Sequence, residues 1–308
     1  MANRRNFIKN GIAATAGLSL SGNLFAKSGP KNLATNEFKL LYAPHFGMFK
    51  NSAGDDLFDQ LKFMSEVGFK ALEDNGMMKK PIETQKKIGE TMAKLGMKMG
   101  VFVIDGGDNW KISLTTGTSE FKDTFLKTCR EAVEVAKRCN AKYMTVVPGF
   151  FERKLPIGIQ TANVIDAYRR ACDIFEPHGL VMVMEPLSDT PELFLRNSDQ
   201  SFLICKAVNS PSCKILFDMW HMQRNEGQMT KNMDLVWDEI GYFQIGDEPG
   251  RKEPTTGEIN YNFLFKHIYD KAKENKQEFI LGMEHGNFFK GKEGEEKLIQ
   301  AYVQSDKF

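Results

Sequence analysis

The sequence has little of several features that mark common protein classes. It contains no run of about 18 apolar residues, so it offers no ordinary membrane-spanning helix. Its 41 Lys and Arg nearly equal its 40 Asp and Glu, and a net charge of +1 argues against a protein that binds nucleic acid through a general positive field. It has only 5 histidines, which argues against a DNA-repair nuclease with a histidine-rich multi-zinc centre.

The cysteines are few and scattered. The 5 cysteines form no CxxC pair and no zinc-ribbon spacing, and an odd number over 308 residues indicates packing residues rather than a disulfide framework. Hydrophobic residues make up 42% of the chain and charged residues 26%, which is an ordinary globular composition. The length fits one large domain or two ordinary ones.

The N-terminal segment has the composition of an export signal. Residues 1–36 contain no acidic residue, and a basic start is followed by the uncharged stretch 11–20 and small residues near Ala26. Arg4-Arg5 followed by Phe7-Ile8-Lys9 resembles a twin-arginine (Tat) signal. We therefore predict that residues 1–30 are a signal segment, that the Tat export machinery is a partner, and that the protein is periplasmic. The alternative is a disordered basic tail on a cytoplasmic protein, and the cleavage site stays open.

Two sequence patterns alternate from Phe38 onward. Short apolar runs predict strands buried on both faces, and each is followed by a longer stretch with apolar residues at helical spacing. The predicted strands are 38–43, 69–73, 98–104, 142–148, 180–185, 214–218, 241–246 and 278–284. The predicted helices are at about 55–67, 82–95, 118–138, 159–176, 197–208, 230–238, 261–275 and 293–304.

Eight strand–helix units in about 270 residues match the size and order of a (β/α)8 TIM barrel, an α/β fold. A doubly wound open sheet is the competing fold, but it usually has fewer repeats and a glycine-rich first turn. The turn after the first strand reads Ala43-Pro44-His45-Phe46-Gly47 instead. No linker or low-complexity segment divides the rest of the chain, so residues 36–308 are predicted to form one barrel domain.

Polar residues occupy the C-terminal ends of the four later strands, where barrel enzymes carry their chemistry. They are Glu185, Asp218, Gln244 and Glu284. Any one of them could instead cap a helix, but four on consecutive strands favour a shared site. Three carboxylates at one barrel mouth would repel one another, and a divalent cation removes that cost. Ligation by oxygen alone suits Mg2+ or Mn2+ better than zinc, so this quartet predicts one such ion.

Three further strand ends carry single polar residues. His45 and Glu73 lie at the ends of the first two predicted strands and are candidates for substrate binding. Asp105 opens the turn sequence Asp105-Gly106-Gly107-Asp108, and we interpret it as a loop residue.

Several local sequences resemble one known family. They are Glu185-Pro186-Leu187, Phe217-Asp218-Met219-Trp220-His221-Met222-Gln223, Gln244-Ile245-Gly246-Asp247-Glu248-Pro249-Gly250-Arg251, and Glu253-Pro254 followed by Gly257-Glu258-Ile259-Asn260-Tyr261. In this order and spacing they resemble the hydroxypyruvate isomerase branch of the xylose-isomerase-like barrels. The likeness is specific over about 180–287 and depends only on strand order before that. The segment 72–76 and the loop 105–117 depart from it.

The resemblance implies the same four metal ligands that the strand ends indicate. It also implies that Glu185 and Glu284 act as the catalytic acid–base pair, and that His221 and Arg251 hold substrate oxygens. In such an enzyme one glutamate would remove the proton from the hydroxyl-bearing carbon beside the carbonyl, and the enediolate formed would be stabilised by the cation. Return of the proton to the adjacent carbon gives an isomerase, and return to the other face of the same carbon gives an epimerase.

We therefore predict a divalent-metal-dependent isomerase or epimerase that acts on a small sugar or hydroxy-keto acid. One alternative is a dehydratase (lyase) of a keto-polyol such as inosose, which would need the same ligands. Another is an exported sugar-binding protein without activity. The sequence leaves open the substrate, the metal and whether the chain forms a homo-oligomer.

Overall fold

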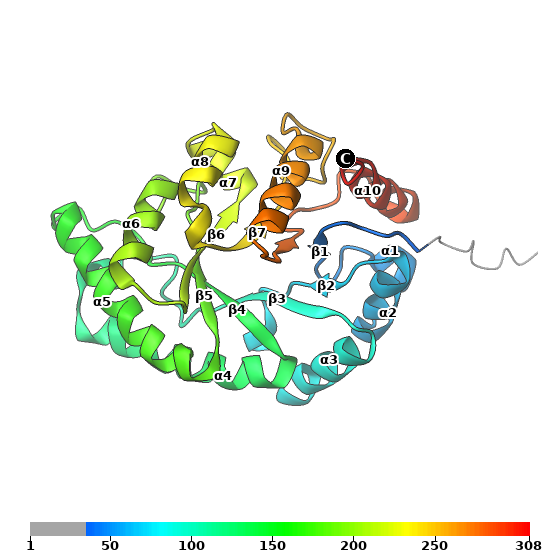
Figure 1. The fold of residues 1–308 in the computed structure, drawn as a ribbon. Coiled ribbons are helices and arrows are strands. Elements are labelled where there is room, and N and C mark those ends of the chain that lie inside the picture. The colour runs from blue at the N-terminus through cyan, green and yellow to red at the C-terminus, as the bar shows by residue number, and fades with distance from the viewer. Residues whose placement is uncertain (1–34) are drawn as a thin grey trace, which may run out of the picture. The chain divides into compact units, whose positions relative to one another are not determined.

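Strands and helices alternate along the chain in the computed structural model, which describes residues 35–308 (Figure 1). The strands are β1 (Leu41–Ala43), β2 (Ala71–Leu72), β3 (Lys98–Val103), β4 (Ala141–Val146), β5 (Val181–Met184), β6 (Cys213–Asp218), β7 (Ile240–Gln244) and β8 (Ile280–Gly282). Each predicted strand is confirmed, and most are shorter than the apolar run that predicted them.

The strands form one parallel sheet that nearly closes on itself. Neighbours pair in the order β1-β8-β7-β6-β5-β4-β3-β2. At the remaining seam a single parallel bridge joins His45 to Glu73, and the Glu73 N–H donates to the Pro44 carbonyl at 3.0 Å. The arrangement is a (β/α)8 barrel, as the eight repeats predicted, and not an open doubly wound sheet.

Side chains fill the inside of the barrel. The apolar cluster there comes from nearly every strand and consists of Ala43, Ala71, Val101, Val181, Val183, Leu216, Tyr242 and Ile280. Tyr242 is the largest of them, and its hydroxyl lies where a Cβ on Gly100 of β3 would be. A glycine at this position therefore makes room for a tyrosine that reaches across the barrel.

The helices surround the barrel, as Figure 1 shows. They are α1 (Lys50–Ala53), α2 (Leu57–Val67), α3 (Ile82–Lys94), α4 (Ser119–Cys139), α5 (Ile157–Phe175), α6 (Ser198–Val208), α7 (Met219–Asn225), α8 (Met229–Val236), α9 (Tyr261–Glu274) and α10 (Gly291–Ser305). A larger apolar layer packs their inner faces against the outside of the strands. Within residues 35–308, no helix combines the length and the apolar character that crossing a bilayer requires.

The helix ends follow the sequence. Asp56 caps α2, where its side chain accepts hydrogen bonds from the N–H groups of Phe58 and Asp59, and Gly68 ends the helix with a φ of 113°. All five cysteines are buried and unpaired, which confirms that they are packing residues. The predicted signal segment, residues 1–30, lies outside the described residues and stays a prediction.

Candidate active site

The predicted quartet lies at one end of the barrel. Glu185 directly follows β5, Asp218 and Gln244 end β6 and β7, and Glu284 lies two residues beyond β8. Asp218 and Gln244 are partners in the register of their two strands, so their side chains leave the sheet on the same side. The strand ends therefore place these four side chains at one mouth.

The two oxygens of Asp218 have different partners. Its Oδ1 accepts hydrogen bonds from the N–H groups of Trp220 at 2.7 Å and His221 at 3.2 Å, and so caps the short helix α7. Its Oδ2 accepts a hydrogen bond from Arg251 at 2.9 Å. The cap fixes the carboxylate in place and leaves the second oxygen turned toward the site.

Arg251 lies between two of the carboxylates. Its Nη2 donates to Glu284 Oε2 at 2.7 Å as well as to Asp218, and its Nε donates to the Glu284 carbonyl at 3.1 Å. Its backbone has a φ of 48°, in the left-handed region, and its guanidinium lies 4.5 Å from the Trp220 ring centroid. The single guanidinium of Arg251 thus forms ion pairs with two carboxylates at the mouth.

His221 presents one ring nitrogen to the site. Its Nδ1 accepts a hydrogen bond from the Ser188 backbone N–H at 3.0 Å, so Nδ1 carries no proton. Burial lowers the pKa of the ring, which leaves a neutral imidazole whose single proton is on Nε2. That nitrogen is buried and has no hydrogen-bond partner within residues 35–308. His221 Nε2–H can therefore donate a hydrogen bond to a bound substrate.

The Nε2 atom of His221 faces acidic oxygens. It lies 3.6 Å from Glu185 Oε1 and 3.8 Å from Asp218 Oδ2, and ligand atoms of these three residues lie within 4.8 Å of one another. Glu185, Asp218 and His221 could therefore hold a cation by distance alone. The proton on Nε2 argues against the histidine as a ligand, because only an unprotonated nitrogen binds a metal.

The pKa values of the three carboxyls do not all change in the same direction. Burial, together with the charge of Glu284, raises the pKa of Glu185 well above its usual value. Burial also raises the pKa of Glu284 to about 7, against the opposing charge of Arg251. Burial acts the same way on Asp218, but His221, Arg251 and two backbone N–H groups outweigh it and lower the pKa. Since His221 is neutral, the positive charge that stabilises the Asp218 anion is that of Arg251, and the two backbone N–H groups add hydrogen bonds.

Glu73 and Gln244 contact each other beneath the mouth. Both oxygens of Glu73 lie 3.3 Å from Gln244 Nε2, and Tyr242 donates to Glu73 Oε2 at 3.1 Å. Glu73 and Gln244 are each 1% exposed, and Gln244 Oε1 has no hydrogen-bond partner within residues 35–308. Burial, together with the charge of Glu284, raises the pKa of Glu73.

His45 lies on the β1 side of the mouth. Its Nδ1 is 2.9 Å from the Phe46 carbonyl and its Nε2 is 3.1 Å from the His285 carbonyl, so backbone groups engage both ring nitrogens. Asn75, which the sequence analysis did not select, donates to Glu284 Oε1 at 2.8 Å. A role for His45 in substrate binding stays a prediction.

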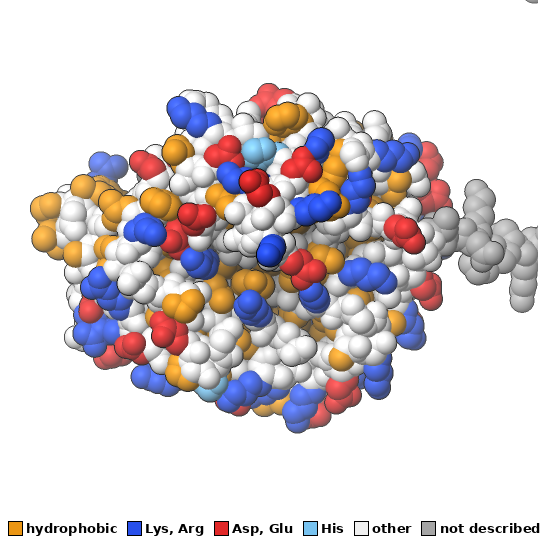
Figure 2. All heavy atoms as spheres, viewed as in Figure 1, with side chains coloured by type: hydrophobic (Ala, Val, Ile, Leu, Met, Phe, Trp, Pro, Cys, Tyr) orange, Lys and Arg blue, Asp and Glu red, His pale blue; other side chains and the backbone are white. Residues whose placement is uncertain are grey.

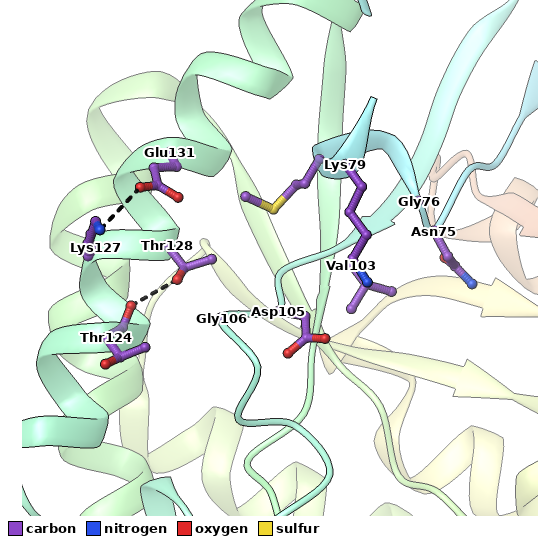
Figure 3. Close-up of a pocket in the computed structure, with 11 residues that line it drawn as sticks. Asn75, Gly76, Lys79, Val103, Asp105, Gly106, Thr124, Lys127, Thr128 and Glu131 are labelled. Atoms are coloured by element: carbon purple, nitrogen blue, oxygen red, sulfur yellow. Dashed lines mark hydrogen bonds and ion pairs between the residues drawn. The ribbon is translucent and has the colours of Figure 1, made fainter. Parts of the chain in front are cut away.

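A cavity of about 680 Å3 lies beside the mouth, between the short 3-10 helix η1 (Met77–Lys79) and α4 (Figure 3). Asn75, at its edge, connects it to Glu284. Lys79 and Asp105 face the cavity in Figure 3. The Asp105 side chain accepts a hydrogen bond from the Gly107 N–H at 2.7 Å, which agrees with its interpretation as a loop residue.

The donor set at the mouth fits a hard divalent cation. It offers three carboxylates and the unpartnered amide oxygen of Gln244, and a cation would satisfy that buried oxygen. The residues that would hold the ion are Glu185, Asp218, Gln244 and Glu284.

Residues 61–300 match the family model described as "Xylose isomerase-like TIM barrel". The chain therefore belongs to this family, and the resemblance inferred from its motifs is confirmed.

Two curated relatives are isomerases by name. Hydroxypyruvate isomerase of Escherichia coli is 34% identical over 143 residues, which are 44% of this chain and 54% of that protein, so the match spans about half of its length. 2-oxo-tetronate isomerase of Pectobacterium atrosepticum is 26% identical over 219 residues, 68% of this chain and 80% of that protein.

Solved structures share the fold. An AP endonuclease, family 2, from Brucella melitensis superimposes with a TM-score of 0.70 at 21% identity, over 82% of this chain and 95% of that one. At this identity the likeness shows the barrel alone.

Proposed function

We propose that the protein is a divalent-metal-dependent isomerase or epimerase of a small sugar or hydroxy-keto acid. The observation that carries the proposal is the convergence of Glu185, Asp218 and Glu284 on a mouth where Gln244 leaves an amide oxygen unpartnered. Both relatives described above are named as isomerases of small keto acids, which supports the same class.

The cation, Mg2+ or Mn2+, would supply Lewis acidity toward a carbonyl oxygen and the neighbouring hydroxyl of the substrate. The chain's own residues would do the rest. Glu185 and Glu284 are the acid–base pair, in which one removes the carbon-bound proton and the other returns it. Asp218 is linked to Glu284 through Arg251, which donates hydrogen bonds to Asp218 Oδ2 and to Glu284 Oε2.

His221 and Arg251 would bind the oxygens of the substrate. The proton on His221 Nε2 has no partner within the described chain, so it is free to stabilise the oxygen that becomes negative in the enediolate. Arg251 offers a planar guanidinium that can hold a carboxylate or hydroxyl of the substrate.

The dehydratase and the non-catalytic sugar-binding protein remain the alternatives, because each would use the same ligands. A nuclease with a histidine-rich multi-zinc centre is disfavoured, because the one group of potential metal-binding side chains found within residues 35–308 includes a single histidine, His221. On the face drawn in Figure 2, positive and negative side chains are interspersed, with no broad basic groove.

The test is hydrogen exchange in deuterated water. The Mn2+-loaded protein is incubated with hydroxypyruvate, 2-oxo-tetronate, a panel of ketoses and inosose, and NMR follows the carbon-bound protons beside each carbonyl. We expect exchange and product with at least one compound, loss of both with chelator or in Glu284→Gln, and full activity in the control Asp105→Asn. Loss of a hydroxyl would identify the dehydratase, and saturable binding with no exchange would identify the binding protein.

A further inference from the structure

Gln244 differs from the other three proposed ligands, because its amide has two ends of similar shape and opposite function. The oxygen can bind a cation, whereas the NH2 group repels one. A ligand of this kind works only if something fixes which end faces the ion.

Glu73 is the side chain that contacts the NH2 end of this amide. Both of its oxygens lie 3.3 Å from Gln244 Nε2, and Tyr242 donates to Oε2 at 3.1 Å. A carboxylate accepts hydrogen bonds and gives none, so Glu73 can accept from the NH2 end of Gln244 but has nothing to donate to its oxygen. The NH2 end of Gln244 therefore faces Glu73, and Oε1 is left buried without a partner within residues 35–308.

We propose that Glu73 is a positioning residue that holds the Gln244 amide with its oxygen toward the metal. This inference rests on the proposed function, since it assigns Glu73 a role through a metal ligand instead of a contact with substrate. Burial supports it, because Glu73 is 1% exposed beneath Gln244, and a hydrogen-bonded neighbour that orients a ligand typically changes metal affinity 10–100-fold.

The experiment measures binding of Mn2+ alone, by calorimetry and by the electron paramagnetic resonance signal of free Mn2+. In Glu73→Gln, an NH2 group can face the amide, turn Gln244 around and remove the oxygen from the ion. We expect Mn2+ affinity to fall at least tenfold. The double variant Glu73→Gln/Gln244→Glu reverses the pair, because the new amide donates to one carboxylate oxygen and leaves the other for the cation. It keeps volume and total charge, and we expect affinity to return to within about threefold of the parent.

Tyr242→Phe is the matched control, since it removes the other hydrogen bond to Glu73 but leaves the Glu73–Gln244 contact. We expect its affinity to stay within about threefold of the parent. Melting of the metal-free variants separates loss of fold from loss of ligand orientation. Unchanged Mn2+ affinity in Glu73→Gln, or no recovery in a folded double variant, overturns the role of Glu73 alone. A parent protein that binds no Mn2+ overturns that role and the proposed metal dependence together.

Discussion

Gly282 and Glu73 share one space inside the barrel: Oε2 of the Glu73 carboxylate lies where a Cβ on residue 282 would be. Gly282 ends β8, and the Cγ of Gln244 lies 3.1 Å from the same point. The same oxygen accepts a hydrogen bond from the Tyr242 hydroxyl. Residue 282 must therefore be a glycine because the Glu73 carboxylate and the Gln244 side chain occupy the space of a Cβ. Its backbone conformation does not require one, since its φ is not in the left-handed region.

Gly282→Ala is expected to destabilise the protein by about 1–3 kcal/mol, the usual cost of adding a methyl group to a packed interior. The methyl group would displace Glu73 and with it the Gln244 amide, so Mn2+ affinity should fall too. Urea unfolding of the metal-free protein measures the first effect and calorimetry the second.

Gly158→Ala provides the matched control, because a Cβ at this position in α5 has nothing within 4 Å. It should leave stability unchanged or raise it by up to about 1 kcal/mol, since alanine favours helix. Equal stability of the two variants would show that the interior around Glu73 yields easily.

Arg251→Met is expected to make the protein depend more on metal for its stability. Without the guanidinium, Asp218 and Glu284 lose hydrogen bonds of 2.9 and 2.7 Å and face each other without a positive charge. Asp218 is fully buried, and a buried carboxylate that loses its positive partner is strongly destabilising, whereas Mn2+ can replace the missing charge. We expect a lower melting temperature without metal and a larger rise on addition of 1 mM MnCl2 than in the parent.

Arg224→Met is the control for that experiment. Arg224 also lies against Trp220, with a ring-centroid distance of 4.6 Å, but its ion pair is with Glu248, outside the quartet. Its rise in melting temperature with Mn2+ should equal that of the parent. If Mn2+ raises the melting temperature of Arg251→Met by no more than that of the parent, the cation does not replace the charge of the missing guanidinium.

The sequence predicts the barrel and the quartet for one physical reason. The strands are buried on both faces, so each appears as an apolar run, and a polar residue at its end is conspicuous. Helix α7 was missed because it has only seven residues, from Met219 to Asn225, too few for a periodic pattern.

Contacts across the barrel could not be read from the chain. Glu73 meets Tyr242 and Gln244 although 169 and 171 residues separate them, and nothing in the local sequence indicates this pairing. Asp218 shows a further limit: its sequence position is compatible with a helix cap or a site residue, and its two oxygens serve one role each. Asn75 could have been predicted as a site residue, since it lies two residues after Glu73, in the turn that follows this strand end.

The proposed export through the Tat machinery would depend on Arg4 and Arg5. If the twin-arginine interpretation holds, Arg4→Lys/Arg5→Lys should keep the protein out of the periplasm while the parent reaches it. Cell fractionation with antibody detection measures this, and the single substitution Lys9→Arg is a control that keeps the arginine pair. Equal periplasmic amounts in the double variant and the parent would contradict the Tat route.

His221 provides the sharpest separation between a ligand and a hydrogen-bond donor. In His221→Asn, the new side-chain oxygen can still accept from the Ser188 N–H, as Nδ1 does at 3.0 Å, but no group replaces Nε2–H. Loss of one donor to a developing oxyanion typically lowers kcat about 100–1000-fold, so we expect a fall of that size with the compound that the parent turns over.

Mn2+ affinity of the same variant should stay within about threefold of the parent, because a nitrogen that carries a proton is not a metal ligand. His178→Asn is the control, because His178 is exposed in the 3-10 helix that follows α5. This substitution should change neither kcat nor Mn2+ affinity. A tenfold or greater loss of Mn2+ affinity in His221→Asn would instead place the imidazole among the ligands. It would require the ring to lose its Ser188 hydrogen bond or to change tautomer when the ion binds, and nitrogen NMR of the ring would detect that change directly.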